Sequence, residues 1–457
     1  MSLPAPATAG YWPQPWTCED GGPRRWGSAA GVAGLGIGPG EGLAVAAVRD
    51  AFAIGALVRR ELGELYALRH DVPVRGTHTT PVEAWVERLD PASLAVTAAT
   101  PRLPGGPFWP GGIAVHRSGD LHVVFGCWAH RLGPGLEVLA SQRLPVERPY
   151  NSFVVLDGGE LVTKDCDAPR GLAPSTVSAL DPGTLVAVAP PLPLPEPSIA
   201  RLSSDGDSVV AVGTTRLFRI RLDRAAGRLE LDDAWSPAYG PEPGRSYGWD
   251  PVLTGEHVLW LDQGRNRTDR TMLGSGEEPA PVRLWWARLD DGAVGSTEVS
   301  GLPYGTVSNP PAWDPATRTV VAYDSGNGAI GAWRFGDSEA ELLWRRDDIA
   351  HAGHLIAYPD TRELLVGDWR DLKLMRRPGI RPLVRAVGQA GSRFAAARRA
   401  SLRSGHDEAV VLDLDTGAER ARVAVPSASQ GFLFPAPGFG RDVYYQSITT
   451  IARVEVA

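Results

Sequence analysis

Cysteine is scarce in this 457-residue sequence, and the positions of the few cysteines exclude several kinds of protein. Cys18, Cys127 and Cys166 form no closely spaced pair of the type that binds zinc or builds a disulfide framework. We therefore expect reduced thiols, as in a cytoplasmic protein.

Long apolar runs are also missing. The first residues lack the basic start and apolar core of a signal peptide, and no later run reaches the roughly 20 residues needed to span a membrane. The net charge of -7 and the pI of about 5.8 argue against nucleic acid as the main partner. These features predict a cytoplasmic protein with a small-molecule partner, and they leave its oligomeric state open.

Lysine is almost absent. Of the 46 basic residues, all except Lys164 and Lys373 are arginines. This bias is typical of a GC-rich genome and by itself indicates no function, but it makes each lysine worth separate attention.

Glycine, proline and tryptophan, in contrast, are abundant. The 53 Gly and 40 Pro are spread among short apolar runs, and the 15 Trp can help to fill a large core. The pattern indicates many short strands joined by turns. Residues 308–335, SNPPAWDPATRTVVAYDSGNGAIGAWRF, show it in the fewest residues: a strand, a DPAT turn, a strand, a loop and a third strand. With Glu341 to Trp344 as a fourth strand, they form one blade of a β-propeller.

The same unit recurs along the chain. Further units start at Gly111, Asn151, Ser198, Asp250 and His354. A first unit combines strands near residues 32–37, 43–48, 82–89 and 94–98, and three last strands follow residue 431. We expect the N-terminal strand near residues 11–17 to complete that last blade, because such pairing removes exposed strand edges. The sequence thus predicts a single all-β propeller domain over residues 1–457, with eight blades, or seven if the first unit is irregular.

Three insertions interrupt the repeats. Residues 50–80 have apolar residues at helical spacing and predict a short helix. Residues 264–281 are polar, and residues 370–408 are locally basic, which indicates a solvated surface or a cover over an acidic region. All three follow the second strand of a blade, so we expect them to lie over one mouth of the central channel as lids.

The channel mouth is where we expect the functional site. In a meander, the first strand of a blade starts on the face where its second strand ends, so residues at those two positions share one mouth. Residues at or just before first strands include Trp109, Asn151, Glu196, Asp250, Asn309, His351, His354 and Gln430. Residues at the ends of second strands include Lys164, Asp262, Asp324 and Asp368.

These acids and amides have two interpretations. Each can be a turn former that accepts hydrogen bonds from backbone amides. Taken together, so many acceptors around a narrow channel would repel one another unless a cation neutralised them. Carboxylate and amide oxygens without clustered thiolates favour Ca²⁺, or Mg²⁺, over Zn²⁺.

Four of these residues carry a resemblance to known proteins. Asn151, Glu196, Asp250 and Asn309, one from each of four successive blades, resemble the Glu, Asn, Asn and Asp that hold a central divalent metal in the gluconolactonase and paraoxonase-like propellers. Those families have six blades, so the number of blades departs from their pattern. The resemblance implies a metal that polarises a carbonyl group or activates water.

Other mouth residues are candidates for catalysis or substrate binding. His351 and His354 either move protons, with Asp368, Asp262 and Asp324 as neighbouring acids, or tie strands together. Lys164 is either an ion-pair partner or an amine nucleophile, and the second role needs a desolvated pocket. Trp109, Trp249, Trp369 and Gln430 could line a substrate site. We expect Trp313 and Trp333, which lie inside strands, to be core residues.

The leading hypothesis is a lactonase-like hydrolase or lyase with a metal-supported site in the channel mouth. The first alternative is a non-catalytic propeller that binds a ligand or a protein on the same face. A further alternative is an acid-catalysed isomerase or cyclase for a hydrophobic substrate. A quinoprotein dehydrogenase would also have eight blades, but the sequence has neither an export signal nor adjacent cysteines.

Overall fold

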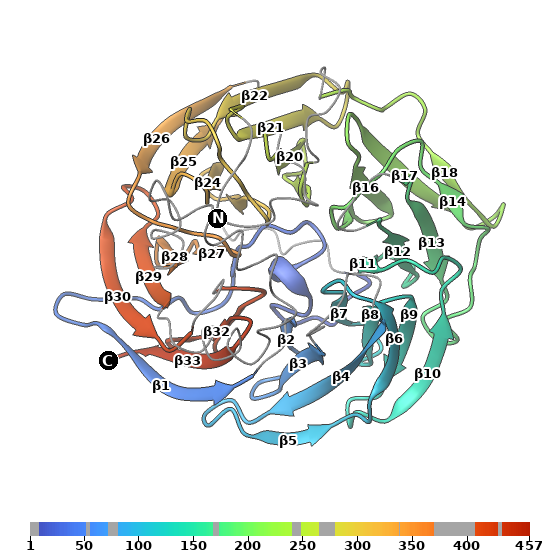
Figure 1. Ribbon diagram of the computed structural model, residues 1–457, viewed down its shortest axis with the longest axis horizontal. Coiled ribbons are helices and arrows are strands. Elements are labelled where there is room, and N and C mark those ends of the chain that lie inside the picture. The colour runs from blue at the N-terminus through green and yellow to red at the C-terminus, as the bar shows by residue number, and fades with distance from the viewer. Residues whose placement is uncertain are drawn as a thin grey trace, which may run out of the picture.

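Eight antiparallel blades, seven with four strands and one with five, form a closed ring in the computed structural model, so the predicted eight-bladed propeller is confirmed (Figure 1). The structure describes residues 9–51, 55–71, 81–167, 173–239, 248–264, 279–337, 339–369, 407–427 and 432–457. Within them, no helix is long and apolar enough to cross a membrane.

The strands follow the predicted meander from the inside of the ring outward. Blade 1 has β2 (Leu57–Arg59), β3 (Leu65–His70), β4 (Pro81–Leu89) and β5 (Val96–Ala99), with β6 (Leu103–Pro107) also paired to β4; blade 2 has β7 (Gly112–Val115), β8 (Leu121–Phe125), β9 (Trp128–Leu132) and β10 (Val138–Arg143). Blade 3 has β11 (Tyr150–Val155), β12 (Leu161–Asp165), β13 (Thr176–Leu180) and β14 (Leu192–Pro193); blade 4 has β15 (Ser203–Asp205), β16 (Ser208–Val212), β17 (Leu217–Asp223) and β18 (Arg228–Leu231).

The second half of the ring repeats this order. Blade 5 has β19 (Val252–Leu253), β20 (His257–Leu261), β21 (Arg283–Arg288) and β22 (Val294–Glu298); blade 6 has β23 (Ala312–Asp314), β24 (Thr319–Asp324), β25 (Ala329–Phe335) and β26 (Ala340–Arg346). Blade 7 has β27 (Ile356–Tyr358), β28 (Glu363–Trp369), β29 (Asp407–Asp413) and β30 (Glu419–Val425); blade 8 has β31 (Ala436–Pro437), β32 (Asp442–Gln446), β33 (Thr450–Val456) and, from the other end of the chain, β1 (Leu43–Asp50). Apolar clusters fill the spaces between blades, and they include Trp313 and Trp333 as predicted.

The ring is closed by pairing of N- and C-terminal strands, as predicted, but through a different N-terminal segment. Strand β1 pairs with β33 along its length, from Leu43 opposite Val456 to Asp50 opposite Thr450. The expected donor, residues 11–17, forms no strand of this blade, and residues 32–37 form no strand of blade 1.

The helix predicted in residues 50–80 is wrong for the described part of that segment. Leu57–Arg59 and Leu65–His70 are the two inner strands of blade 1, and residues 52–54 and 72–80 lie outside the described residues. Every residue of β3 is buried, because the strand is covered on both faces. The sequence of a strand that is buried on both faces is a continuous apolar run, and the spacing of its apolar residues cannot distinguish it from a buried helix.

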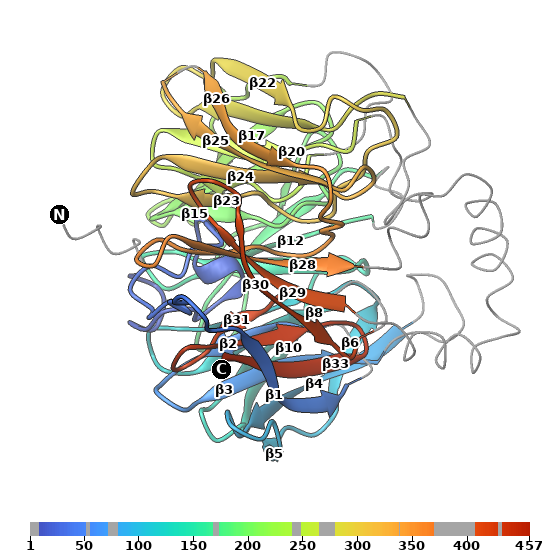
Figure 2. The same cartoon turned by 90° about the vertical axis from the view of Figure 1, so that its left-hand side faces the viewer.

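Residues 11–29, which we call the clasp, run around the inside of the ring and contact all eight blades. Trp12 N–H donates to the Val115 carbonyl and Trp16 Nε1 donates to the Pro435 carbonyl. The clasp accepts the remaining bonds from the backbone N–H groups of the blades: Val155 to Tyr11 Oη, Arg59 to Trp16, Ser204 to Pro23, Leu253 to Arg24, Trp313 to Trp26 and Ala357 to Gly27. The short 3-10 helix η1 (Glu19–Gly21) lies at the centre of the ring (Figure 1). In Figure 2 strand β28 points to the right, and the clasp lies on the left-hand side of the ring. We call the clasp side the clasp face and the other side the far face.

Candidate functional site

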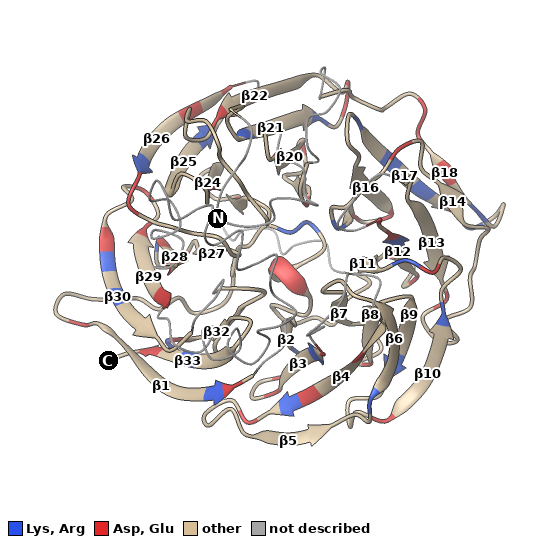
Figure 3. Ribbon diagram, viewed as in Figure 1, with Lys and Arg blue, Asp and Glu red and all other residues tan. Residues whose placement is uncertain are grey.

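A buried group of charged residues occupies the centre of the ring, where the acidic helix η1 meets the inner strands (Figure 3). Arg25 Nη1 lies 2.8 Å from Asp20 Oδ2 and 3.3 Å from Glu19 Oε2. Arg201 Nη1 lies 2.9 Å from Asp250 Oδ2, and its Nε lies 3.7 Å from Glu19 Oε2. All five side chains are less than 5% exposed. We call these five residues the central cluster.

The central cluster explains how the centre of the ring tolerates the carboxylates of Glu19, Asp20 and Asp250. The sequence predicted that a bound cation would be needed to offset their repulsion, but Arg25 and Arg201 supply positive charge from the chain itself. Burial tends to raise the pKa of Asp250, but Arg201 and Arg25 together hold it below the usual value. Burial raises the pKa of Glu19 despite the two guanidinium groups, so Glu19 binds a proton more readily than an exposed glutamate does.

Ser152 joins the central cluster from blade 3. A β-bulge between Tyr150 and Phe153 leaves Ser152 with a φ of 67°, and its Oγ donates a hydrogen bond of 2.6 Å to Glu19 Oε2. The contact depends on Gly112, where a Cβ atom would overlap both Ser152 and Glu19. Bulges are frequent beside active sites, where they redirect a side chain.

Backbone strain is concentrated around this cluster. Non-glycine residues with positive φ include Trp16, Asp20 and Arg25 in the clasp, Ser152 beside it, and Phe432 and Phe434 at the start of blade 8. Phe434 lies under the Arg201 guanidinium at 4.3 Å. Of the other such residues in the described part of the chain, Leu94, Leu136 and Leu185 lie in turns between outer strands, Arg318 and Arg362 lie in turns between inner strands, and Tyr304 lies between blades 5 and 6. Strained residues persist only where the surrounding structure enforces them, and they are common at functional sites.

The two predicted histidines tie strands together. His354 Nδ1 accepts a hydrogen bond from the backbone N–H of Phe434 in blade 8, which leaves the proton on Nε2, 3.5 Å from Asp20 Oδ1. Both ring nitrogens of His351 lie within about 3.1 Å of backbone carbonyls, those of Gly367 and Gly353. Burial lowers the pKa of both histidines to about 4. His354 Nε2 has no hydrogen-bond partner among the described residues, and a catalytic role for the two histidines stays a prediction.

The acids at the ends of second strands bind backbone amides. Asp262 accepts hydrogen bonds from the backbone of Arg283 and from Trp285 Nε1, and Asp324 accepts them from Ser300 and from the backbone of Thr306. Asp368 accepts one from the backbone of Ala350 and pairs with Arg422 at 2.9 Å. These contacts match the turn-former interpretation, and a catalytic role for the three acids stays a prediction.

The four predicted metal ligands have separate partners. Asn151 donates to the carbonyl of Ile199, Asp250 binds Arg201, Glu196 accepts bonds from the turn at residues 214–216, and Asn309 donates to Ser308 and the carbonyl of Ala352. Within the described residues, no group of three or more His, Cys, Asp or Glu is placed to hold a metal ion. The four side chains do not form a common ligand set here, so a divalent cation at the centre stays a prediction.

The remaining predicted residues lie in or near the same region. Trp109, Trp249 and Trp369 are buried, with 8% exposure at most, and the first two pack with Cys166 and Ile199 in one apolar cluster. Lys164 is fully buried, and no carboxylate pairs with it in the described part of the chain; its neighbour Asp165 pairs with Arg148. Gln430, most of residues 264–281 and residues 370–406 lie outside the described residues.

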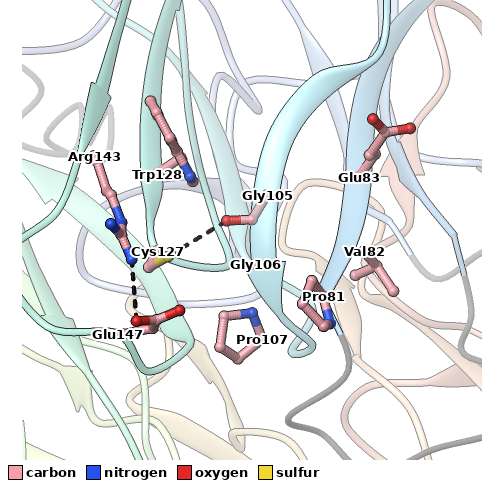
Figure 4. A pocket seen from close by; sticks show the side chains of 10 residues that line it. All are labelled: Pro81, Val82, Glu83, Gly105, Gly106, Pro107, Cys127, Trp128, Arg143 and Glu147. Atoms are coloured by element: carbon pink, nitrogen blue, oxygen red, sulfur yellow. Dashed lines mark hydrogen bonds and ion pairs between the residues drawn. The ribbon is translucent and has the colours of Figure 1, made fainter.

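A separate cavity of about 360 Å³ lies on the far face between blades 1 and 2 (Figure 4). Its lining includes Gly105, Cys127, Trp128, Arg143 and Glu147. Burial raises the pKa of the Cys127 thiol, which lies 3.6 Å from the Gly105 carbonyl, and Arg143 is already paired with Glu147 at 3.1 Å. The cavity can hold a small molecule but presents no activated nucleophile.

Sequence reasoning missed most of the central cluster. Glu19, Asp20 and Arg25 come from a segment without a strand pattern, and only the folded structure shows that it reaches the centre. Arg201 had a detectable signal, because it lies just before the first strand of its blade, at a position similar to that of Asp250. Ser152 follows Asn151 directly and was missed because serine is common in strands and turns.

Comparison with known proteins shows the fold alone. No family model matches the chain, and no curated protein shows significant sequence similarity to it. Among solved structures, BamB from Moraxella catarrhalis has a TM-score of 0.55 at 10% identity, over 90% of this chain and 99% of its own. The quinohemoprotein alcohol dehydrogenase from Comamonas testosteroni has a TM-score of 0.55 at 10% identity, over 97% and 81% of the two chains. A europium-containing methanol dehydrogenase has a TM-score of 0.51 at 10% identity, over 96% and 89%.

The similar structures thus include two dehydrogenases as well as BamB, whose name states no activity. The resemblance of four channel residues to gluconolactonase and paraoxonase-like propellers is not shown by these comparisons.

Proposed function

We propose that the protein is a hydrolase of small carboxyl esters or lactones, with Ser152 as the nucleophile and Glu19 as its base. The observation that carries this proposal is the 2.6 Å hydrogen bond from Ser152 Oγ to a buried carboxylate that Arg25 holds in place. A nucleophile bonded to a base, which a third group orients, is the arrangement that activates hydroxyl groups in acyl transfer. The proposal keeps the reaction class expected from the sequence and places it on residues of the chain.

Each step of acyl transfer has a group that fits it. Ser152 Oγ attacks the ester carbonyl while Glu19 takes the hydroxyl proton and passes it to the departing alkoxide oxygen. Arg25 Nη2, 3.5 Å from Ser152 Oγ, lies where it can stabilise the negative charge that develops on the carbonyl oxygen. Water, deprotonated by Glu19, then hydrolyses the acyl-serine and regenerates the hydroxyl group. In a lactone, the alkoxide stays attached to the acyl product.

The raised pKa of Glu19 supports a general-base role with a defined pH dependence. A base acts only when it is deprotonated, so kcat/KM should rise with pH as Glu19 ionises. Glu19→Gln keeps the shape of the side chain and removes the base. We expect it to lower kcat/KM about 100-fold or more and to abolish this limb of the pH profile.

A fluorophosphonate probe tests the proposal without knowledge of the substrate. The probe should form one covalent adduct on Ser152, identified by peptide mass mapping. Ser152→Gly should abolish the adduct, and glycine also accepts the positive φ at this position. Ser178→Ala, which removes a buried hydroxyl from β13 of the same blade, should label like the unchanged protein. Folded protein that the probe does not label at Ser152 would overturn the proposal.

A second candidate is a non-catalytic binding propeller. It is favoured by the polar residues of the channel that link one blade to the next: Asn151 links blades 3 and 4, Asn309 links blades 6 and 7, and His354 links blades 7 and 8. If the protein binds a partner and has no catalytic activity, the probe should leave Ser152 unmodified. A panel of esters and lactones should then show no turnover above background.

A further inference from the structure

Lys164 is an unusual lysine because its ammonium group is fully buried with one bonding partner. It lies near the end of β12, and its Nζ donates a 2.7 Å hydrogen bond to the carbonyl oxygen of Ser198 in blade 4. An ammonium group has three donors, so two are unused among the described residues. Burial lowers its pKa to about 8, against the opposing effect of Cys166, Asp165 and Asp250. Among the described residues no carboxylate pairs with Lys164, and its burial provides the desolvated surroundings that a reactive amine needs.

The choice of lysine at this place is informative in a chain that uses arginine almost everywhere else. Only Lys164 and Lys373 among the 46 basic residues are lysines. Arginine would supply a cation and more donors, and the central cluster uses it twice for that purpose. What lysine offers and arginine does not is an amine that can lose its proton and act as a nucleophile.

The β-bulge places two polar residues opposite Lys164. Tyr150 pairs with Asp165 and Phe153 with Thr163, so Asn151 and Ser152 are the two residues that face Lys164 across the strand pair. Asn151 Nδ2 donates to the carbonyl of Ile199, directly after the carbonyl that Lys164 binds. Asn151 is 1% exposed, and its Oδ1 has no hydrogen-bond partner in the described part of the chain. A buried acceptor without a partner costs free energy unless a ligand or water satisfies it.

We propose that Lys164 is a nucleophilic amine that forms an imine with a small aldehyde or ketone at the centre of the ring. The neutral Nζ attacks the carbonyl carbon, a C–N bond forms and the carbonyl oxygen becomes the hydroxyl of a carbinolamine. Asn151 Oδ1 accepts a hydrogen bond from that hydroxyl. Loss of water, which carries away the carbonyl oxygen and both amine hydrogens, gives the imine. The reaction needs no other reactant, and it does not depend on the role of Ser152.

Reductive trapping tests this proposal on the full-length protein. Acetaldehyde with cyanoborohydride at pH 7 converts an imine into a stable ethylated lysine, which peptide mass mapping locates. An amine with a pKa of about 8 is roughly one-tenth neutral at pH 7, far more than an ordinary lysine. We expect Lys164 to be ethylated at least tenfold faster than Lys373, the other lysine of the chain. Modification of Lys373 or the N-terminal amine with Lys164 unmodified would overturn the proposal.

Two variants sharpen the result. Lys164→Arg keeps the positive charge but cannot form an imine, so its Lys164 adduct should disappear while ethylation of Lys373 continues. Lys373→Arg should retain the Lys164 adduct. If Lys164→Arg fails to fold, the mapping of the unchanged protein decides alone. Fluorophosphonate labelling of Ser152 is scored separately, so failure of one proposal leaves the result for the other readable.

Discussion

The chain closes its ring twice, and the two closures are built in opposite ways. The outer closure is the ladder between β1 and β33, in which side chains of β1 alternate between half-buried and exposed. The inner closure is the clasp, which contacts each blade through single residues and brings Glu19, Asp20 and Arg25 into the buried centre. The backbone hydrogen bonds of a strand pair form with almost any side chain, whereas a buried charged side chain is stable only with its oppositely charged partner. The clasp therefore supports the fold and the candidate site with the same residues.

The largest expected difference between the closures comes from removing one arginine from each. Arg25→Met leaves Glu19 and Asp20 buried without their shared partner, so we expect it to lower the free energy of unfolding by about 3–5 kcal/mol. Arg453→Met in β33 breaks pairs with Asp442 and Glu455, but Arg453 is about a quarter exposed and the buried Asp442 keeps a hydrogen bond from the backbone N–H of Gly440, so we expect a smaller loss of about 1–2 kcal/mol. Urea denaturation measures both variants. Equal losses would mean that the clasp does not carry the buried charges as described.

Acid should destabilise the folded protein through its buried histidines, and it should not weaken the pairing of β1 with β33 in the outer closure. Burial lowers the pKa of His70 to about 3 and those of His122, His130, His351 and His354 to about 4. Between those values and the unfolded pKa of about 6.5, the unfolded chain binds protons that the folded chain does not. The stability that these neutral histidines contribute should therefore fall as the pH drops below 6.5, and most of this loss should be complete near pH 4. Strands β1 and β33 contain no histidine.

The effect of acid can be measured at one residue, His354, which lies beside Asp20 of the clasp. His354→Gln should reduce the slope of unfolding free energy against pH by up to one proton, about 1.4 kcal/mol per pH unit. Urea midpoints at pH 7, 6 and 5 measure the slope, and Arg453→Met serves as a control with an unchanged slope. A slope that His354→Gln leaves unaltered would show that His354 does not stay neutral in the folded protein.

The contrast between the closures also explains what the sequence could predict. The blades repeat a strand and turn pattern that local residues determine, so the eight-bladed ring and the pairing of its ends were predicted correctly. The clasp has no such repeat, because its Gly- and Pro-rich residues are held by contacts with strands hundreds of residues away. Three of the five charges of the central cluster come from it, so the sequence could not show that the carboxylates are neutralised by arginines.

The same limit applies to single channel residues. Asp250 and His354 were expected at the channel mouth from their position within a blade, and the structure places each of them within about 3.5 Å of a residue of the central cluster. Their partners were not predictable, because Arg201 and Phe434 come from neighbouring blades and depend on the rotation between blades. For Lys164 the sequence left an ion pair and a nucleophilic amine open, because it could not show that the nearby carboxylate of Asp165 is paired with Arg148.

The smallest expected effect is on the outer face of the β1 ladder. Val48 is 45% exposed and lies opposite Ala452, and the backbone bonds between the strands do not depend on its side chain. Threonine has the same shape and a similar strand preference, so Val48→Thr should change the free energy of unfolding by less than about 0.5 kcal/mol. The urea midpoint, measured beside Arg25→Met, provides the check. A loss above about 1.5 kcal/mol would mean that the outer closure also depends on specific side-chain contacts, and the contrast with the clasp would no longer hold.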